Sequence, residues 1–334
     1  MNIAQVLRET ARAVDHIMLR YLCKGVGGDF RPIVAHQVRA GGKRVRPAWT
    51  LLSCQACGGR VSDALLPAAI MELIHNYSLI MDDIIDHGEL RRGRLTVRAK
   101  YDDAQALLAG MFYREVLGEM AQNSPHPREM YALIVNAIKQ TIEGERMDTL
   151  CEQTSRADQY ITRHRYTEVT PELYFKVIKK KTAELIRAAC LAGAIAAEAR
   201  KPHLEAISAY GERVGLAFQV IDDFLDMFGQ ETGKQMGKDI IEHKLNNAVI
   251  VYALPEMSLQ ERNRFMRIIK AKEVDQAELK QALELLESAD ARTRVLRLAK
   301  RLVKEAKRSL EALPKTSARE GLAELADFIA ARKY

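Results

Sequence analysis

Two short acidic clusters on apolar, helix-patterned segments constrain this chain more than any other feature. Each reads D-D-x-x-D: the first is Asp82–Asp86 and the second is Asp222–Asp226. Burying an ionised carboxylate without a partner is very costly, so these clusters need a compensating charge. Residues i and i+4 of a helix share a face, so the first and last aspartate of each cluster point the same way. Clustered carboxylate oxygens suit hard cations, and two such faces across a cavity would hold several Mg²⁺ ions and a polyphosphate.

Helical periodicity runs through nearly the whole chain. Apolar residues recur at three- and four-residue spacing in nine segments: 3–21, 48–56, 64–86, 128–148, 172–197, 203–228, 240–254, 277–287 and 295–312. No run alternates with period two. Because the two acidic clusters lie about 140 positions apart, two distant helices must converge to form one site. The sequence therefore predicts an all-α bundle with a large central cavity, in a single domain over residues 1–334.

Composition limits the classes of protein that this chain can represent. Five cysteines, an odd number, do not suggest a disulfide framework, and the C-x-x-C pair Cys54 and Cys57 fits helix packing better than zinc or redox chemistry. No uncharged apolar stretch reaches the roughly 18–20 residues that span a bilayer, and the N-terminus has no signal-peptide pattern. We therefore expect a cytoplasmic protein without stable membrane insertion.

The charge of the chain is mildly basic. Its formal net charge is +7, from 51 Lys and Arg against 44 Asp and Glu, and aromatic residues make up only 6%. This balance fits a small anionic substrate and offers no base-stacking platform, so we expect no nucleic-acid partner. Contact with an acidic membrane surface is an open alternative, although the basic residues are not gathered on one obvious stripe.

Basic residues follow or precede the acidic clusters at four places. Arg91 and Arg92 come directly after the first cluster, where paired guanidinium groups suit a diphosphate bound through Mg²⁺. The alternative, that these arginines only neutralise the aspartates, is weakened by the second cluster. The other three places are G-G-K-R-V-R-P at 41–47, K-K-K-T at 179–182, and G-K-Q-M-G-K-D at 233–239 with Lys244. In the first of these, Lys43 and Arg46 share a face if a helix begins there.

Five motifs, in order and spacing, make the chain similar to the all-trans isoprenyl diphosphate synthases, and the similarity covers almost its whole length. They are residues 41–47, the first acidic cluster with L-R-R-G at 90–93, K-T at 181–182, F-Q-x-x-D-D-x-x-D at 218–226, and G-K-x-x-G-K-D at 233–239. The resemblance implies antiparallel helices of the isoprenoid synthase type and a homodimer, with a heteromer as the alternative. It also implies a Mg²⁺-dependent prenyltransferase that joins isopentenyl diphosphate to an allylic diphosphate head-to-tail.

The same resemblance assigns roles to individual residues. It makes Asp82, Asp86 and Asp222 ligands of three Mg²⁺ ions, which Mn²⁺ can replace, with Asp83 and Asp226 in support. The residues that it places on the allylic diphosphate are Arg91, Lys181 and Lys234, with Lys244 nearby. The groups that would face the allylic cation are the Lys181 carbonyl, the Thr182 hydroxyl and Gln219. Those that would hold isopentenyl diphosphate are Lys43, Arg46, His75 and Arg92.

Product length depends on how deep the cavity runs below Asp82. Tyr77 lies five residues earlier, or about 7–8 Å deeper at roughly 1.5 Å per residue. A tyrosine on this pattern could be plain core, but the family's usual ruler positions are here Tyr77 and Ser78. One aromatic beside a small serine resembles the archaeal geranylgeranyl type. We therefore expect a C20 product, geranylgeranyl diphosphate, with C15 (farnesyl) and C25 (geranylfarnesyl) as the alternatives.

The chain departs from the usual family pattern at four positions. Met81 replaces a frequent His, Arg98 ends the usual T-x-H, Met111 ends L-A-G-D, and Glu145 stands in G-Q-x-x-D. These departures motivate a second hypothesis, a regulatory subunit that binds prenyl diphosphate within a heteromeric synthase. A third is a class I terpene cyclase. The second acidic cluster and G-G-K-x-x-R argue against it, because a cyclase needs no isopentenyl site.

Overall fold

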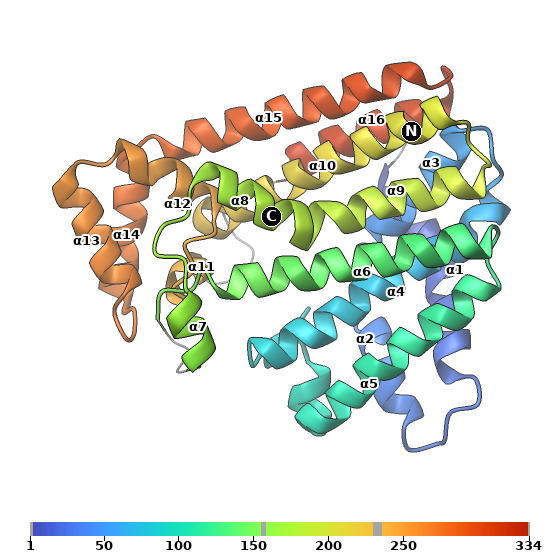
Figure 1. The fold of residues 1–334 in the computed structure, drawn as a ribbon, viewed down its shortest axis with the longest axis horizontal. Coiled ribbons are helices and arrows are strands. Elements are labelled where there is room, and N and C mark those ends of the chain that lie inside the picture. Colours follow the sequence, from blue (N-terminus) through green and yellow to red (C-terminus); the bar gives the residue numbers. More distant parts are fainter. Residues whose placement is uncertain (1–2, 155–157, 230–235, 333–334) are drawn as a thin grey trace. The chain divides into compact units, whose positions relative to one another are not determined.

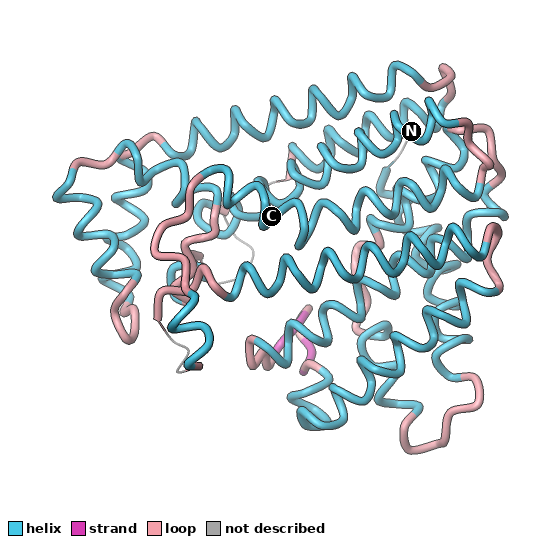
Figure 2. Tube along the Cα trace, viewed as in Figure 1, coloured by secondary structure: helices cyan, strands magenta, loops and turns pink. Residues whose placement is uncertain are grey.

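The computed structural model describes residues 3–154, 158–229 and 236–332, and the described chain is helical apart from one short β-hairpin (Figures 1 and 2). The predicted all-α class is therefore confirmed. The chain divides into two compact units. The first comprises residues 1–139, 185–211 and 309–325, and the second comprises 140–184, 212–308 and 326–334. The expectation of one domain over 1–334 stays a prediction, and each unit is described by itself.

The first unit is built on α1 (Ile3–Cys23), α2 (Arg31–Arg39), α3 (Val45–Ala56), α4 (Val61–Ile85) and α5 (Val97–Gln122). Between α4 and α5 lies the hairpin of β1 (Leu90–Arg91) and β2 (Arg94–Leu95). The unit also contains the first part of α6 (Pro127–Thr149), most of α9 (Glu184–Ala196), the start of α10 (Lys201–Phe228), η3 (Leu310–Ala312) and the start of α16 (Ser317–Ala330).

Helix α4 forms the centre of the first unit's core. Its side chains from Ala68 to Ile74 are almost fully buried, and it packs against α3 and α5. By length and composition α4 could also cross a membrane, but 67% of its most apolar stretch is buried inside the structure. That burial is what the central helix of a helical bundle requires. The helix ends where His87 takes a left-handed conformation (φ 51°), directly after the first acidic cluster.

The second unit holds the remaining elements. They are the end of α6, α7 (Gln159–His164), α8 (Pro171–Ile178), the π-helical turn η1 (Lys179–Ala183), the rest of α10, α11 (Lys238–Ile241), α12 (Ala248–Ala253), η2 (Leu254–Glu256), α13 (Leu259–Ile269), α14 (Gln276–Ser288) and α15 (Ala291–Ser309). Capping boxes begin α13 at Ser258 and α14 at Asp275. These caps fix the start of two helices whose exposed faces are strongly charged.

Candidate active site

The first acidic cluster ends α4, and its three carboxylates have different environments. Asp83 is 3% exposed, and Arg91 holds it with Nη2 2.7 Å from Oδ1 and Nε 3.0 Å from the same oxygen. Asp82 is half-buried and Asp86 is exposed at the helix end. A carboxylate that is bound this closely by a guanidinium serves the structure of the protein, and we call such an aspartate an anchor. The other two aspartates, which lie one helical turn apart, are the more accessible members of the cluster.

The hairpin explains why Arg91 reaches back to Asp83. Its two-residue turn, Arg92 and Gly93, has positive φ at both positions (56° and 73°), as a type I′ turn requires. The register pairs Arg91 with Arg94. Arg91 is the last residue of β1 and bonds Asp83, whereas Arg92 lies in the turn and reaches the loop of Gly42.

Arg92 lies against the glycine loop that precedes α3. A Cβ atom on Gly42 would lie only 2.7 Å from Arg92 Nη1 and 2.8 Å from Arg44 Nη1, and Gly42 has φ 149°. Only glycine tolerates both the conformation and the contact. The structure thus brings together two of the predicted isopentenyl elements, the G-G loop and Arg92. Lys43 is exposed and precedes the first residue of α3, Val45, so the predicted helix face shared with Arg46 does not form.

His75 lies on α4 among the same arginines. Burial lowers the pKa of His75 well below its usual range, and the positive charges of Arg46, Arg92, Arg91 and Arg44 lower it further. The imidazole is therefore neutral at neutral pH. A neutral ring can donate or accept a hydrogen bond but adds no charge to this basic cluster.

Arg44, which the sequence argument left without a role, organises the loop from inside. Its side chain is fully buried, with Nε 2.7 Å from Asp15 Oδ1 and Nη1 3.0 Å from Glu72 Oε1. It also donates to the carbonyls of Gly41 (2.9 Å) and Val38 (2.9 Å). Four hydrogen bonds to two carboxylates and two carbonyls make it a structural arginine. Its left-handed conformation (φ 50°) and its complete burial distinguish it from Lys43 and Arg46.

The second acidic cluster lies on α10 in the second unit and repeats the pattern of the first. Its middle member, Asp223, is 4% exposed and accepts hydrogen bonds from Tyr174 Oη (2.6 Å), Gln219 Nε2 (2.8 Å) and the Ala248 amide (2.9 Å). Burial raises the pKa of Asp223, and the neighbouring charge of Asp239 raises it further. Asp223 is therefore an anchor, as Asp83 is.

The outer members of this cluster are more open. The Asp222 side chain is 53% exposed, while Asp226 is half-buried and accepts a hydrogen bond from the Asp239 amide (3.1 Å). Burial, followed by the charge of Asp239, raises the pKa of Asp226 to about 7. A carboxylate that is this reluctant to ionise is one that a bound cation would stabilise strongly.

The predicted cation-facing groups lie next to Asp223. The Thr182 hydroxyl donates to Gln219 Oε1 (2.6 Å), and Gln219 in turn donates to Asp223, which forms a chain from η1 to α10. Thr182 lies in a π-helical turn, a distortion often found at functional sites. Gly144 of α6 makes this turn possible at close range, because a Cβ there would lie 2.3 Å from the Lys181 amide nitrogen.

Lys181 is held by two carboxylates of α6. Its Nζ lies 2.8 Å from Glu145 Oε2 and also contacts Asp148. Burial opposes ionisation of Asp148, yet the positive charges of Lys181 and Lys244 hold its pKa below the usual value. Lys244 itself pairs with Glu242 (2.9 Å). The Lys181 ammonium is thus charged and positioned, while the predicted ligand Lys234 lies outside the described residues.

A further arginine at the end of the chain was missed by the sequence argument. Arg332 Nη2 lies 3.8 Å from Asp222 Oδ1, and its guanidinium carbon lies 5.0 Å from the centre of the Phe218 ring. No motif marks this position, since it follows an ordinary amphipathic helix. Arg332 adds a cation to the second cluster that only the folded chain reveals.

The predicted ruler residues lie on α4, and Tyr77 approaches α5. Tyr77 and Ser78 are both half-buried, and the Ser78 hydroxyl donates to the His75 carbonyl (2.9 Å). A Cβ on Gly110 of α5 would lie 2.7 Å from Met81 Sδ and 3.9 Å from Tyr77 Cε2. Met81, the residue in place of the family's frequent His, therefore fills the space that Gly110 leaves. Tyr77 lies one turn further from the acidic cluster.

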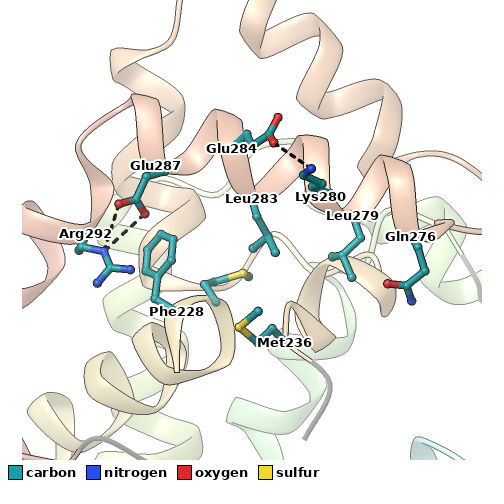
Figure 3. A pocket seen from close by; sticks show the side chains of 10 residues that line it. Phe228, Met236, Gln276, Leu279, Lys280, Leu283, Glu284, Glu287 and Arg292 are labelled. Atoms are coloured by element: carbon teal, nitrogen blue, oxygen red, sulfur yellow. Dashed lines mark hydrogen bonds and ion pairs between the residues drawn. The ribbon is translucent and has the colours of Figure 1, made fainter. Parts of the chain in front are cut away.

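An apolar pocket of about 550 Å³ lies in the second unit, lined in part by the residues that follow Asp226 on α10 (Figure 3). Its charged lining residues are paired: Arg292 with Glu287 (3.2 Å), and Lys280 with Glu284 (3.9 Å). The lining residues are Met227, Phe228, Met236, Gln276, Leu279, Lys280, Leu283, Glu284, Glu287 and Arg292. Since each cation in this described lining already faces an acid, the pocket is poorly suited to a diphosphate.

Comparisons with known proteins show the family and the fold of the chain. Residues 29–286 match the polyprenyl synthetase family. The chain is 34% identical to the short chain isoprenyl diphosphate synthase of Methanothermobacter thermautotrophicus, with both chains covered in full. It is 32% identical to heptaprenyl diphosphate synthase component 2 of Geobacillus stearothermophilus, over 93% of each chain. The crystal structure of geranylgeranyl pyrophosphate synthetase from Pyrococcus horikoshii matches with a TM-score of 0.87 and 31% identity, over 99% of this chain and 98% of that one.

The fold and the family match define a helical prenyltransferase of the isoprenoid synthase type. The chain belongs to the polyprenyl synthetase family and is a trans-prenyl diphosphate synthase. The resemblance seen in the sequence is confirmed at the level of family, fold and class of enzyme.

Proposed function

We propose that this prenyltransferase uses Mg²⁺ to join isopentenyl diphosphate to an allylic diphosphate and that its main product is geranylgeranyl diphosphate. The metal assignment rests on one observation: both acidic clusters contain one aspartate that is bound by the protein and two that are more open. In each, the middle aspartate is bound by protein donors, while the first and last are more open. Carboxylates in this arrangement offer the hard oxygen donors that Mg²⁺ takes, usually alongside substrate phosphates.

Carboxylate oxygens are the donors that Mg²⁺ takes, although no three His, Cys, Asp or Glu side chains are grouped around one metal position among the described residues. Asp82, Asp86 and Asp222 would hold Mg²⁺, with Asp226 in support; burial, followed by the charge of Asp239, raises the pKa of Asp226. When bound, the metal would stabilise negative charge on the departing diphosphate. We further propose that the enzyme is a cytoplasmic homodimer.

The chain's own residues account for the rest of the reaction. Lys181 and Arg91 hold the allylic diphosphate while its C–O bond breaks and the bonding electrons leave with the phosphate oxygen. The oxygens of Thr182 and Gln219 and the Lys181 carbonyl face the allylic cation that results. The isopentenyl double bond then supplies the electron pair of the new carbon–carbon bond, and the released diphosphate takes the proton that is lost.

The second diphosphate is held apart from the first. Lys43, Arg46 and Arg92 bind it by charge, and the neutral His75 contributes a hydrogen bond. Substrate positioning of this kind supplies a large share of the barrier reduction in a two-substrate reaction. The G-G loop allows the closest approach, since Gly42 has no side chain in the way.

Tyr77 carries the proposal of a C20 product. Its half-buried ring lies beside Gly110 and Met81, about 7–8 Å below Asp82 along α4. The match to the Pyrococcus horikoshii geranylgeranyl pyrophosphate synthetase supports the same length. In this proposal the Tyr77 ring is the floor that limits the length of the prenyl tail. A C15 product would require a floor closer to Asp82, and a C25 product would require Tyr77 to move aside.

Product analysis with dimethylallyl, geranyl and farnesyl diphosphates, each with labelled isopentenyl diphosphate and Mg²⁺, tests this proposal. We expect a C20 product from all three primers, and a loss of turnover by orders of magnitude in Asp82→Ala and Asp222→Ala with the fold retained. Near-normal rates in both variants would refute the metal assignment. A dominant C15 or C25 product would refute the proposed floor and leave the metal assignment intact.

A second candidate function is favoured by the match to a protein named as one component of a heptaprenyl synthase. In that case the chain would bind prenyl diphosphate but elongate it only with a partner subunit. The same assay separates the two functions, because a chain that is inactive alone and active with a partner is a subunit. A hydrocarbon product would instead indicate a terpene cyclase.

A further inference from the structure

Helix α15 carries a stripe of cations on the side opposite its buried face. The exposed basic residues follow three- and four-residue spacing, and they are Arg297, Lys300, Arg301, Lys304 and Arg308. We call these five residues the α15 stripe. The buried positions of the same helix, such as Val295, Leu302 and Ala306, point to the other side. The stripe spans about 16 Å at roughly 1.5 Å per residue, along the long helix at the upper edge of Figure 1.

The stripe is not neutralised within the described part of the chain. Other cations of α15 have acidic partners: Arg294 lies 2.9 Å from Glu256, and Lys307 lies 2.7 Å from Asp327. For the five stripe residues, the described ranges 3–154, 158–229 and 236–332 contain no ion-pair or hydrogen-bond partner. Like charges at i and i+4, as in Arg297 and Arg301, destabilise a helix. A locally unfavourable pattern of this kind points to a function.

We infer that the α15 stripe docks the enzyme on an anionic lipid surface. No large apolar side chain of α15 is exposed, so the stripe lacks the buried anchors of a protein interface. It also presents no aromatic ring on which a nucleic-acid base could stack. A plane of anionic headgroups needs neither, because it recognises charge alone, at about 1 kcal/mol per Lys or Arg near the surface.

The chemistry of the enzyme class supports this partner. A prenyl diphosphate synthase releases an amphiphile with a charged head and an apolar tail, which partitions into membranes more readily as the tail grows. An enzyme held at the headgroup plane by charge alone would release that product close to a bilayer. The apolar face of α15 is buried in the protein, so this docking is peripheral and inserts no helix.

Flotation of the full-length protein with lipid vesicles tests the inference. We expect binding to vesicles of phosphatidylcholine with 30% phosphatidylglycerol in 0.1 M salt, and no binding to pure phosphatidylcholine. Because electrostatic attraction is screened by ions, binding in 0.5 M salt should be lost. Equal binding to both vesicle types would overturn the inference.

A pair of matched variants identifies the surface. One carries Arg297→Gln, Lys300→Gln, Arg301→Gln and Lys304→Gln, and the control carries Arg264→Gln, Arg267→Gln, Lys270→Gln and Lys272→Gln, all exposed residues of the same unit. Both lose four charges. At roughly fivefold per cation, the stripe variant should bind at least a hundredfold more weakly, while the control stays close to the wild type.

Two further measurements keep the test decisive. Unchanged prenyltransfer and circular dichroism show that the stripe variant is folded, so its loss of vesicle binding counts for the inference. Equal vesicle binding by the two variants would refute it. Tight, stripe-dependent binding of a single-stranded oligonucleotide without vesicle binding would also refute it and assign the stripe to nucleic acid.

Discussion

Replacing Arg44 with methionine should destabilise the protein strongly, although Arg44 makes no proposed contact with substrate. The variant keeps a long, flexible apolar side chain in a site where the arginine is fully buried. It leaves Glu72, which is 2% exposed, without its counter-charge. Breaking a buried ion pair from one side costs about 3–5 kcal/mol. The carbonyls of Val38 and Gly41 lose their donors as well.

Urea unfolding followed by circular dichroism measures this cost. We expect Arg44→Met to lower the unfolding free energy by about 3–5 kcal/mol. Adding Glu72→Met removes the stranded carboxylate, so the double variant should recover much of the loss. Arg60→Met is the control, because Arg60 pairs with Asp63 at the surface with its side chain 83% exposed, where ion pairs contribute little.

Two outcomes would refute this reasoning. One is a loss below about 1 kcal/mol in Arg44→Met, which would mean that the buried pair contributes no more than a surface pair. The other is a double variant that is no more stable than Arg44→Met, which would mean that the cost does not come from the stranded Glu72. A rise in KM for isopentenyl diphosphate should accompany the stability loss, because Arg44 fixes the loop of Gly41 and Gly42.

Three other predictions follow from the sites described above. The pKa of Asp226 is about 7 in the folded chain and 3.8 when unfolded, so the metal-free protein should lose up to roughly 4 kcal/mol of stability as pH rises from 4 to 8. Urea unfolding with a chelator present measures stability against pH, and Asp226→Asn should flatten that curve between pH 4 and 8. Parallel curves for the variant and the wild type would contradict the prediction. Tyr77→Ala should give products longer than C20 in chromatography of the prenyl alcohols, because the ring beside Gly110 would no longer block the cavity; an unchanged length would remove Tyr77 as the floor. Glu145→Gln should lower KM for the allylic diphosphate about two- to fivefold, because Lys181 would then be held by one carboxylate fewer; a higher KM would show that Glu145 helps to bind substrate.

The helices were predictable where one apolar stripe runs without interruption. The segments expected at 3–21, 203–228 and 277–287 appear as α1, α10 and α14 with boundaries within a few residues. Helix α5 was missed because its pattern is broken: Asp102 has φ 72° inside it and caps the longer second part through Gln105. Helices α13 and α16 were also missed, although neither is interrupted, because charged residues break their apolar positions into short groups.

The sequence marked candidate site residues but not the partners that hold them. The motifs marked Asp83, Lys181 and Gln219, but the donors and acceptors that hold them come from elsewhere in the chain. Tyr174 donates to Asp223 from 49 positions away, and Asn246 donates to Asp148 from 98 positions away. Such contacts depend on tertiary packing, which spacing along one sequence does not encode.

The reading of the basic residues as scattered was wrong for α15. In the sequence, residues 291–309 contain eight Lys and Arg and one acid, Glu305, with no run of adjacent bases longer than two. The fold sorts them, because Arg294 and Lys307 pair with acids of other segments while five cations remain on one exposed face. A charge stripe of this kind can be recognised only once the partners of its neighbours are known.

The two acidic clusters are best understood as anchors and ligands that share one motif. Asp83 and Asp223 are nearly buried and fully engaged, one by a guanidinium and the other by a phenol, an amide side chain and a backbone amide. Their oxygens can turn to a metal only if these contacts break. Adjacent helical positions lie about 100° apart, so anchoring the middle aspartate fixes the direction of the first, Asp82 or Asp222. Substituting an anchor should therefore lower stability and metal affinity together, whereas substituting Asp82 or Asp222 should lower metal affinity alone.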